Sequence, residues 1–255
     1  VMQMRWGASG DHEMIVLAPS SVQELFDFTI RAFNLAERYR MPVVVMSDTT
    51  IALMRENLVI PEADEIEIVD RPRPTVPPDE FLPFKAGPNG VPPLPDFGDG
   101  YRILHSLNPH DEMGSIHWDP DVFEDLYNRI TGKIAHNYDD IVQTERFYLD
   151  DAEVGLIAYG SECRPVREAV ELARAQGIRA GMLKLDTVWP VPEREIAALA
   201  EQCSRILAVE MNIGKYAGEI ERVVAGRCRV KRVTKNRGLV HTPGEILDAL
   251  GEAMA

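Results

Sequence analysis

Cysteine is scarce in this chain, and the three that occur are far apart and outside any C-x-x-C spacing: Cys163, Cys203 and Cys228. Such a set predicts neither a disulfide framework nor a zinc or iron–sulfur site, so we expect free, buried thiols. Long hydrophobic runs are also lacking, since none approaches the roughly 18 to 20 residues that a membrane span requires. The first residues show no signal-peptide pattern either, and a cytoplasmic protein without membrane contact is therefore expected.

Basic residues are outnumbered. The 27 lysines and arginines face 41 aspartates and glutamates, which gives a formal charge of −14. This balance argues against nucleic acid and anionic membranes as partners. The 255 residues are 45% hydrophobic, which is enough to bury a sizeable core in one or two domains.

The first 56 residues predict an incomplete parallel sheet. Residues 14–18 and 42–46 are short apolar runs typical of buried strands, and a helix is expected between them, from the capping box Ser21-x-x-Glu24 to about Arg40. Its apolar face is expected to contain Val22, Leu25, Phe26, Thr29, Phe33 and Ala36. Two strands and one helix cannot bury both faces of a parallel sheet, so the missing strands are expected from a lost amino-terminal part or from another chain.

The middle of the chain is rich in proline, with ten prolines in residues 61–95. This density favours an extended segment that crosses a surface. Gly98-Asp99-Gly100 follows, and we interpret it as a turn, because it lacks the preceding strand and the later asparagine pair of the metal-diphosphate motif of thiamin enzymes. From Asp119-Pro120 a long helix is expected, with an apolar face made of Phe123, Leu126, Tyr127, Ile130, Ile134, Tyr138 and Ile141.

A polar loop precedes this helix and contains His105, His110 and His117 with Asp111 and Gly114. No two of these histidines have the spacing that places both on one helix turn or strand face, so metal binding is the weakest interpretation. A loop that folds over a site and offers His110 and Asp111 to a substrate is one alternative. A plain surface turn is the other.

From Asp150 onward strands and helices alternate. Four apolar strands are predicted, each followed by a helix: 154–159, 181–185, 206–209 and 230–234. This alternation is typical of a doubly wound, mostly parallel sheet.

Glu210 and Asn212 lie at the carboxyl end of the third of these strands, where open α/β sheets bind ligands or partners. The alternative is a strand-to-helix turn with Asn212 as the N-cap and Gly214 for backbone freedom.

Several strings, in order along nearly the whole chain, resemble the alpha subunit of 2-oxoacid:ferredoxin oxidoreductases, the 2-oxoglutarate type in particular. They are LAPSSVQE (17–24), AFNLAE (32–37) with Pro42 and MSD (46–48), MRE (54–56), HDEMG (110–114), LKLDTVWP (183–190) and EMNIG (210–214).

The resemblance implies an α/β fold in which residues 1–56 are the second half of a thiamin pyrimidine-binding domain with a partial parallel sheet. Residues 57–118 would be a linker and loop, 119–149 a connecting helix, and 150–255 a transketolase carboxyl-terminal-like doubly wound domain. The gamma-like domain and the remaining pyrimidine-domain segments of the family are expected before Val1, so we expect a fragment or a processed product.

The function implied is CoA-dependent oxidative decarboxylation of a 2-oxoacid, with 2-oxoglutarate as the expected substrate and ferredoxin as the electron acceptor. Thiamin diphosphate and Mg²⁺ would be shared with a beta subunit. The iron–sulfur cluster would lie in that partner chain, through which ferredoxin docks, and gamma and delta subunits are further candidate partners. The chain alone would bind no cofactor and would be inactive.

Two other functions fit the same residues. One is a non-catalytic assembly module of a multi-subunit complex. The other is a transketolase-like or pyruvate-dehydrogenase-like thiamin enzyme, which should lack the string at 110–114.

Roles are expected for four residues. The resemblance implies that the loop at 110–114 closes over the thiamin pocket, and we expect His110 to contact the 2-oxoacid and Asp111 to orient His110. From their place at the carboxyl edge of the second sheet, Glu210 and Asn212 are expected to fix a contact with the amino-terminal lobe or with a neighbouring subunit. No catalytic residue and no metal ligand are expected in this chain.

Overall fold

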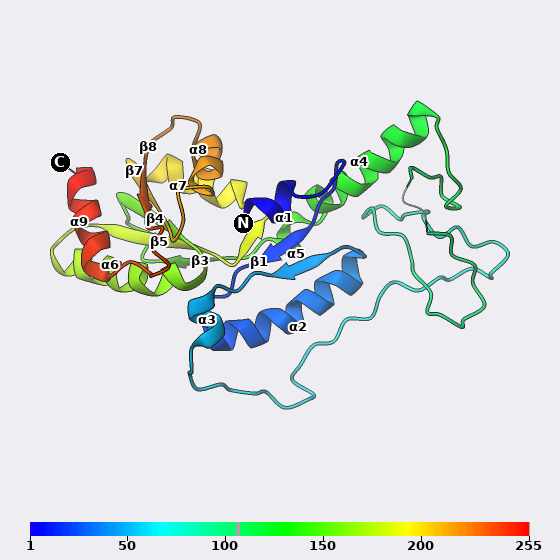
Figure 1. Ribbon diagram of the computed structural model, residues 1–255, viewed down its shortest axis with the longest axis horizontal. Coiled ribbons are helices and arrows are strands. Elements are labelled where there is room, and N and C mark those ends of the chain that lie inside the picture. Colours follow the sequence, from blue (N-terminus) through cyan, green and yellow to red (C-terminus); the bar gives the residue numbers. More distant parts are fainter. Residues whose placement is uncertain (106–107, 255) are drawn as a thin grey trace.

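The computed structural model describes residues 1–105 and 108–254. Ser106 and Leu107, in the expected linker, and Ala255, in the expected carboxyl-terminal domain, lie outside the described residues. The described chain forms a sheet of three strands and a sheet of five. Figure 1 shows them side by side, with the extended middle segment at the opposite end of the molecule from α9.

The larger sheet has the strand order β3-β5-β4-β7-β8. β4 (Val154–Ala158), β5 (Ala180–Leu185), β7 (Arg205–Glu210) and β8 (Arg229–Thr234) run parallel. β3 (Thr144–Phe147) pairs antiparallel with β5 and forms one edge. Every residue of β4 and β5 is buried, as expected for parallel strands covered on both faces.

Helices cover both faces of this sheet. The short helix η1 (Gly160–Glu162) follows β4 and leads into α6 (Cys163–Ala175). α6 packs beside α9 (Pro243–Met254) on one face. α7 (Glu193–Gln202) and α8 (Ala217–Val224) pack together on the other. The predicted doubly wound, mostly parallel arrangement is confirmed.

The smaller sheet has the order β2-β1-β6. β1 (Ile15–Leu17) and β2 (Val43–Val45) run parallel and are joined by α2 (Val22–Tyr39). β6 (Thr187–Trp189) comes from the carboxyl-terminal half and pairs antiparallel with β1. The expectation that the missing strands come from a lost part or another chain is wrong for this side of β1. The chain leaves the larger sheet at Leu185, where β5 ends, and enters the smaller sheet as β6 two residues later. The same chain therefore supplies the strand that neighbours β1 on this side.

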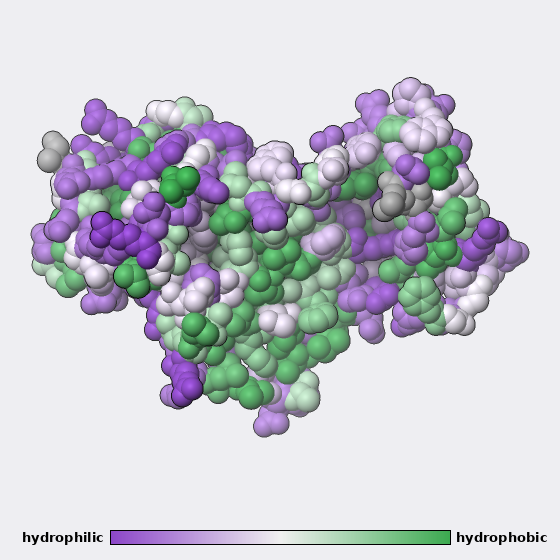
Figure 2. All heavy atoms as spheres, viewed as in Figure 1, coloured by the Kyte–Doolittle hydropathy of each residue, from purple (hydrophilic) through white to green (hydrophobic). Residues whose placement is uncertain are grey.

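α2 buries a different face from the predicted one. The buried residues are Phe28, Ala32, Leu35 and Tyr39, whereas Phe33 is 71% exposed. The helix carries apolar residues on both faces, so spacing alone permits two stripes, and packing against β1 and β2 selects one. Figure 2 shows apolar residues gathered on the surface around α2.

The middle segment has little regular structure. After α3 (Thr49–Leu53), the described residues up to 119 form no helix and no strand, only an isolated bridge between His110 and Ile116. This agrees with the proline-rich sequence. α1 (Met2–Trp6) lies near the start of the chain, and no helix among the described residues is long and apolar enough to cross a membrane.

The connecting helix expected over 119–149 is shorter than predicted. α4 (Pro120–His136) and α5 (Tyr138–Ile141) meet at Asn137, and the chain then enters β3. Asn137 donates its side-chain amide to the carbonyl of Lys133 at 2.7 Å, which competes with the next helical hydrogen bond. The helical pattern therefore breaks there, and 144–147 become an edge strand.

Candidate functional site

A cavity of about 210 Å³ lies between the two sheets at the carboxyl ends of β2, β4 and β7. Its lining includes residues 46–48, 159–162 and 210–212. β4 and β7 are neighbours in the larger sheet. The chain crosses from β4 to β5 on one side of this pair and from β7 to β8 on the other. Open α/β sheets bind ligands at the point where the direction of the crossovers changes in this way. Glu210 and Asn212 therefore lie beside the amino-terminal lobe, which contains β1, α2, β2 and α3.

The carboxylate of Glu210 holds the start of α8. Glu210 is 1% exposed and accepts hydrogen bonds from the backbone N–H groups of Tyr216 at 3.0 Å and Ala217 at 2.7 Å. A carboxylate is favourable there because of the partial positive charge of a helix amino terminus. The hydroxyl of Tyr159 also donates to it at 3.0 Å, and burial together with this carboxylate raises the pKa of Tyr159. Glu210 is thus fully engaged within the chain.

Asn212 closes the turn that follows. Its side-chain oxygen accepts from the backbone N–H groups of Gly214 and the next residue, both at 2.9 Å, and its amide donates to Glu210 at 2.8 Å and to the Tyr159 hydroxyl at 3.1 Å. Gly214 has a φ of 81°, which confirms its predicted backbone freedom. The alternative in which Asn212 is the N-cap is wrong, because α8 starts at Ala217 and Glu210 binds its first N–H groups.

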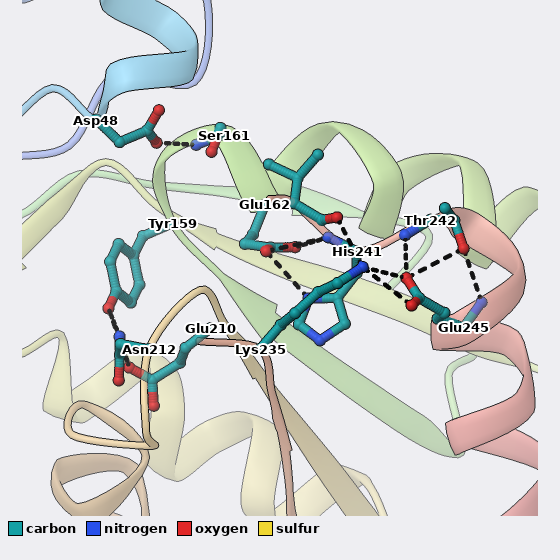
Figure 3. A network of polar contacts seen from close by, with 11 residues as sticks. Asp48, Tyr159, Ser161, Glu162, Glu210, Asn212, Lys235, His241, Thr242 and Glu245 are labelled. Atoms are coloured by element: carbon teal, nitrogen blue, oxygen red, sulfur yellow. Dashed lines mark hydrogen bonds and ion pairs between the residues drawn. The ribbon is translucent and has the colours of Figure 1, made fainter. Parts of the chain in front are cut away.

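Figure 3 shows further polar contacts along this edge. Asp48, the N-cap residue of α3, accepts a hydrogen bond from the backbone N–H of Ser161 at 2.9 Å. The side chain of the next residue, Glu162, is 3% exposed and lies 3.0 Å from Nδ1 of His241. These contacts join the start of α3, η1 and the segment before α9, so the polar groups of this edge mainly fix the positions of these elements relative to one another.

The second candidate site is the loop around His110, which folds into a tight turn. Gly114 donates its N–H to the carbonyl of Asp111 at 3.0 Å. The φ of Gly114 is 89°, and a Cβ there would lie 2.7 Å from the carbonyl oxygen of Leu104. Gly114 is required by this turn, as predicted.

The carboxylate of Asp111 is directed into the loop itself. It accepts from the backbone N–H groups of Met113 at 3.0 Å and Ser115 at 2.9 Å, and one oxygen lies 3.1 Å from Nε2 of His117. Partial burial acts in the opposite direction, but these donors and His117 hold the pKa of Asp111 below its ordinary value. Asp111 reaches His110 through its carbonyl oxygen, 2.9 Å from Nδ1, and not through the carboxylate that was expected to orient it.

The side chain of His110 lies beside a cavity of about 440 Å³ next to α4. Its ring packs against Phe84, with 4.0 Å between the ring centroids. Arg129 of α4 lines the same cavity, together with Glu112 and Leu126. The sequence did not indicate Arg129, because the helical pattern that contains it is set by apolar residues and does not show which polar side chains face the loop.

The two sites are separate within this chain. The cavity at Glu210 lies between the sheets, whereas Figure 1 shows the middle segment at the far end of the molecule. Over residues 1–105 and 108–254, no group of three or more His, Cys, Asp or Glu side chains is placed to hold a metal. The cysteines are free, and Cys163 and Cys203 are buried.

Two family models match the chain. Residues 1–123 match the thiamine diphosphate-binding region of pyruvate flavodoxin/ferredoxin oxidoreductases, and residues 152–246 match core domain II of pyruvate:ferredoxin oxidoreductase. Both lobes therefore match parts of one kind of enzyme.

Curated relatives match along almost the whole chain. The 2-oxoglutarate synthase subunit KorA of Methanothermobacter marburgensis is 47% identical over 98% of this chain, and that of Methanocaldococcus jannaschii is 40% identical over 96%. The ketoisovalerate oxidoreductase subunit VorB of Methanothermobacter thermautotrophicus is 32% identical over 98%. The chain spans 66%, 65% and 63% of these three relatives, respectively.

A solved structure has the same fold. It is the 2-oxoglutarate:ferredoxin oxidoreductase of Magnetococcus marinus with 2-oxoglutarate, coenzyme A and succinyl-CoA bound, with a TM-score of 0.86 and 23% identity over 100% of this chain and 45% of that one. The solved structure shares the two-lobed α/β fold, and the family models assign both lobes to the ferredoxin-linked oxidoreductase class. The chain belongs to the 2-oxoacid:ferredoxin oxidoreductase alpha-subunit family, and its motif strings had indicated this.

Proposed function

We propose that this chain is part of the alpha subunit of a cytoplasmic, thiamin diphosphate-dependent 2-oxoglutarate:ferredoxin oxidoreductase, which carries out CoA-dependent oxidative decarboxylation. The observation that carries the proposal is the 47% identity to a 2-oxoglutarate synthase subunit over 98% of the chain. Free rather than disulfide-bonded cysteines support a reducing compartment.

The cofactors are assigned largely to partner chains. The described residues offer no cluster of oxygen ligands that fits Mg²⁺ with a bound diphosphate, so we place thiamin diphosphate and Mg²⁺ in a site shared with a beta subunit. The three dispersed cysteines do not fit an iron–sulfur cluster, which we place in the partner through which ferredoxin docks. When bound, thiamin diphosphate supplies the electron sink for decarboxylation.

Within this chain, His110 is the proposed substrate contact, and Asp111 keeps its loop in shape. The stacked ring of His110 beside a cavity supports this role, as do the bonds of Asp111 to the loop backbone.

Glu210 and Asn212 are proposed to stabilise a contact with the amino-terminal lobe or a neighbouring subunit, because they line the cavity between the sheets. Asn212→Ala should weaken assembly with a beta subunit and leave turnover per assembled complex within about twofold. Analytical ultracentrifugation and a dye-reduction assay of the same sample measure both. A large loss of turnover in intact complex would instead assign Asn212 to the reaction.

The proposal is tested by mixing the purified chain with a beta subunit, thiamin diphosphate, Mg²⁺, CoA and 2-oxoglutarate and following reduction of a viologen dye. Reduction should need both chains and CoA. An inert mixture in which the two chains nevertheless form a stable complex would favour the assembly-module alternative.

A further inference from the structure

Three cationic side chains lie near one another: Arg40, after α2, and Arg129 and Lys133, one turn apart on α4. Of the three, Arg129 lines the His110 cavity. Burial, followed by the charges of Arg129 and Arg40, lowers the pKa of Lys133 to about 8. Burial and then Arg129 lower the pKa of Arg40 to about 10. In the part of the chain that the structure describes, none of the three has a carboxylate at ion-pair distance, although the chain is strongly acidic.

Two of these cations have structural partners. The amine of Lys133 donates to the carbonyl of Tyr39 at 2.9 Å and of Arg40 at 3.2 Å, where α2 ends. The guanidinium of Arg40 donates to the carbonyls of Pro83 at 2.7 Å and Pro93 at 3.2 Å, and so fastens the proline-rich segment. Carbonyl oxygens satisfy their donors but leave their positive charge without a counterion.

Arg129 differs from the other two. Among residues 1–105 and 108–254, its guanidinium has no hydrogen-bond partner, and Glu112 is the acidic group whose charge acts on it. Both side chains line the cavity that also contains His110, Phe84 and two further acidic residues, Asp111 and Asp125. Desolvation of the guanidinium in this cavity lowers the pKa of Arg129. Because the guanidinium is partly removed from water and has no hydrogen-bond partner among the described residues, an anion that enters the cavity can form charge-assisted hydrogen bonds with it.

We propose that Arg129 binds a carboxylate of the substrate in the cavity that it shares with His110. This rests on the proposed function, in which the His110 loop contacts the 2-oxoacid. A guanidinium matches a carboxylate with two parallel hydrogen bonds, and the ring of Phe84 gives the cavity an apolar wall.

The carboxylate in question is the one remote from the oxo group. The carboxylate next to the oxo group leaves as CO₂, and an arginine that held its full negative charge would stabilise the ground state more than the transition state. Arg129 therefore serves to select dicarboxylate 2-oxoacids over monocarboxylate ones, with Glu112 as a competing anion that weakens the site.

The test measures glutarate binding to the purified full chain by isothermal titration calorimetry. Glutarate is an unreactive dicarboxylate, so the result does not depend on turnover. Arg129→Gln should weaken binding by about tenfold to a hundredfold, the loss of a charge-assisted pair. Glu112→Gln should tighten it. The matched control Arg237→Gln removes the same charge from an exposed position in the other lobe and should leave affinity unchanged.

Absence of glutarate binding by the wild-type chain, or equal affinities for the wild type and Arg129→Gln, would overturn the inference. Such a result would leave the proposed function intact if the reconstituted complex still oxidises 2-oxoglutarate. Glutarate binding that depends on Arg129 supports the site even if the reconstituted complex has no activity. Lack of activity in that complex would count against the proposed function and not against the Arg129 site.

Discussion

His110 is held by its own loop and by an aromatic neighbour. Nδ1 faces the carbonyl oxygen of Asp111, which can only accept, so this nitrogen carries the proton in the neutral ring. The ring also packs on Phe84. The sequence identified His110 and Gly114 because their motif is local. It did not identify Arg129 or the bond between Asp111 and His117, since these depend on how a loop folds back on itself and onto a helix.

Replacing His110 with alanine should raise the KM for 2-oxoglutarate in the reconstituted complex by about tenfold or more, because a hydrogen bond to a charged substrate is lost. The far-UV spectrum and subunit assembly should be unchanged. His136→Ala, at an exposed position near the end of α4, is the matched control. Unchanged kinetics for His110→Ala would leave only the surface-turn interpretation.

At the level of the elements, the four parallel strands of the larger sheet and the helices between them were predicted well, because short apolar runs alternate there with clear helix starts, whereas the edge strand β3 was not predicted. α2 and α4 were predicted less well. Both helices carry apolar residues around much of their circumference, and only tertiary packing decides which stripe is buried. In α2 the choice falls on Phe28 and Leu35 and leaves Phe33 outside.

α9 begins with a complete capping box. Thr242 Oγ1 accepts from the N–H of Glu245 at 3.2 Å, and the Glu245 carboxylate accepts from the N–H of Thr242 at 2.7 Å and from Nζ of Lys235 at 2.8 Å. Lys235 and then the Thr242 backbone lower the pKa of Glu245 to about 2. A carboxyl group whose pKa is lowered by folding stabilises the folded state at pH values above its ordinary pKa. This contribution is lost as the pH falls toward the pKa of the folded state.

The unfolding free energy of the wild type should therefore fall between about pH 4.5 and 2 more steeply than that of Glu245→Gln. Urea titrations followed by circular dichroism across this range measure the difference. Glu171→Gln, at an exposed position of α6, should keep the wild-type slope. Identical slopes for wild type and Glu245→Gln would show that the cap does not contribute to the pH dependence.

Across the whole molecule, one buried amine joins the larger sheet to α2 of the amino-terminal lobe. Nζ of Lys184 in β5 lies 2.5 Å from Glu24 of α2, 2.7 Å from Asp186 and 3.4 Å from Glu145 of β3. Burial opposes the charged amine, but Asp186 and Glu24 raise the pKa of Lys184. The contact between the lobes was not readable from the sequence, because it joins residues 160 positions apart.

Lys184→Met should lower the free energy of unfolding by about 3 to 5 kcal/mol, since it leaves the buried carboxylate of Asp186 without its cation. Arg167→Met removes a partly exposed partner of Glu145 and should cost no more than about 1 kcal/mol. Chemical denaturation of both variants checks this. Equal losses would mean that the buried amine is not the main electrostatic link between the lobes.

The proposed function is tested most sharply by the formation of succinyl-CoA, measured by mass spectrometry after 2-oxoglutarate, CoA, thiamin diphosphate, Mg²⁺ and an electron acceptor are added to this chain, to a beta subunit, and to both. Succinyl-CoA should form only where both chains are present. Its absence from an assembled complex of the two chains would show that the proposed function is wrong.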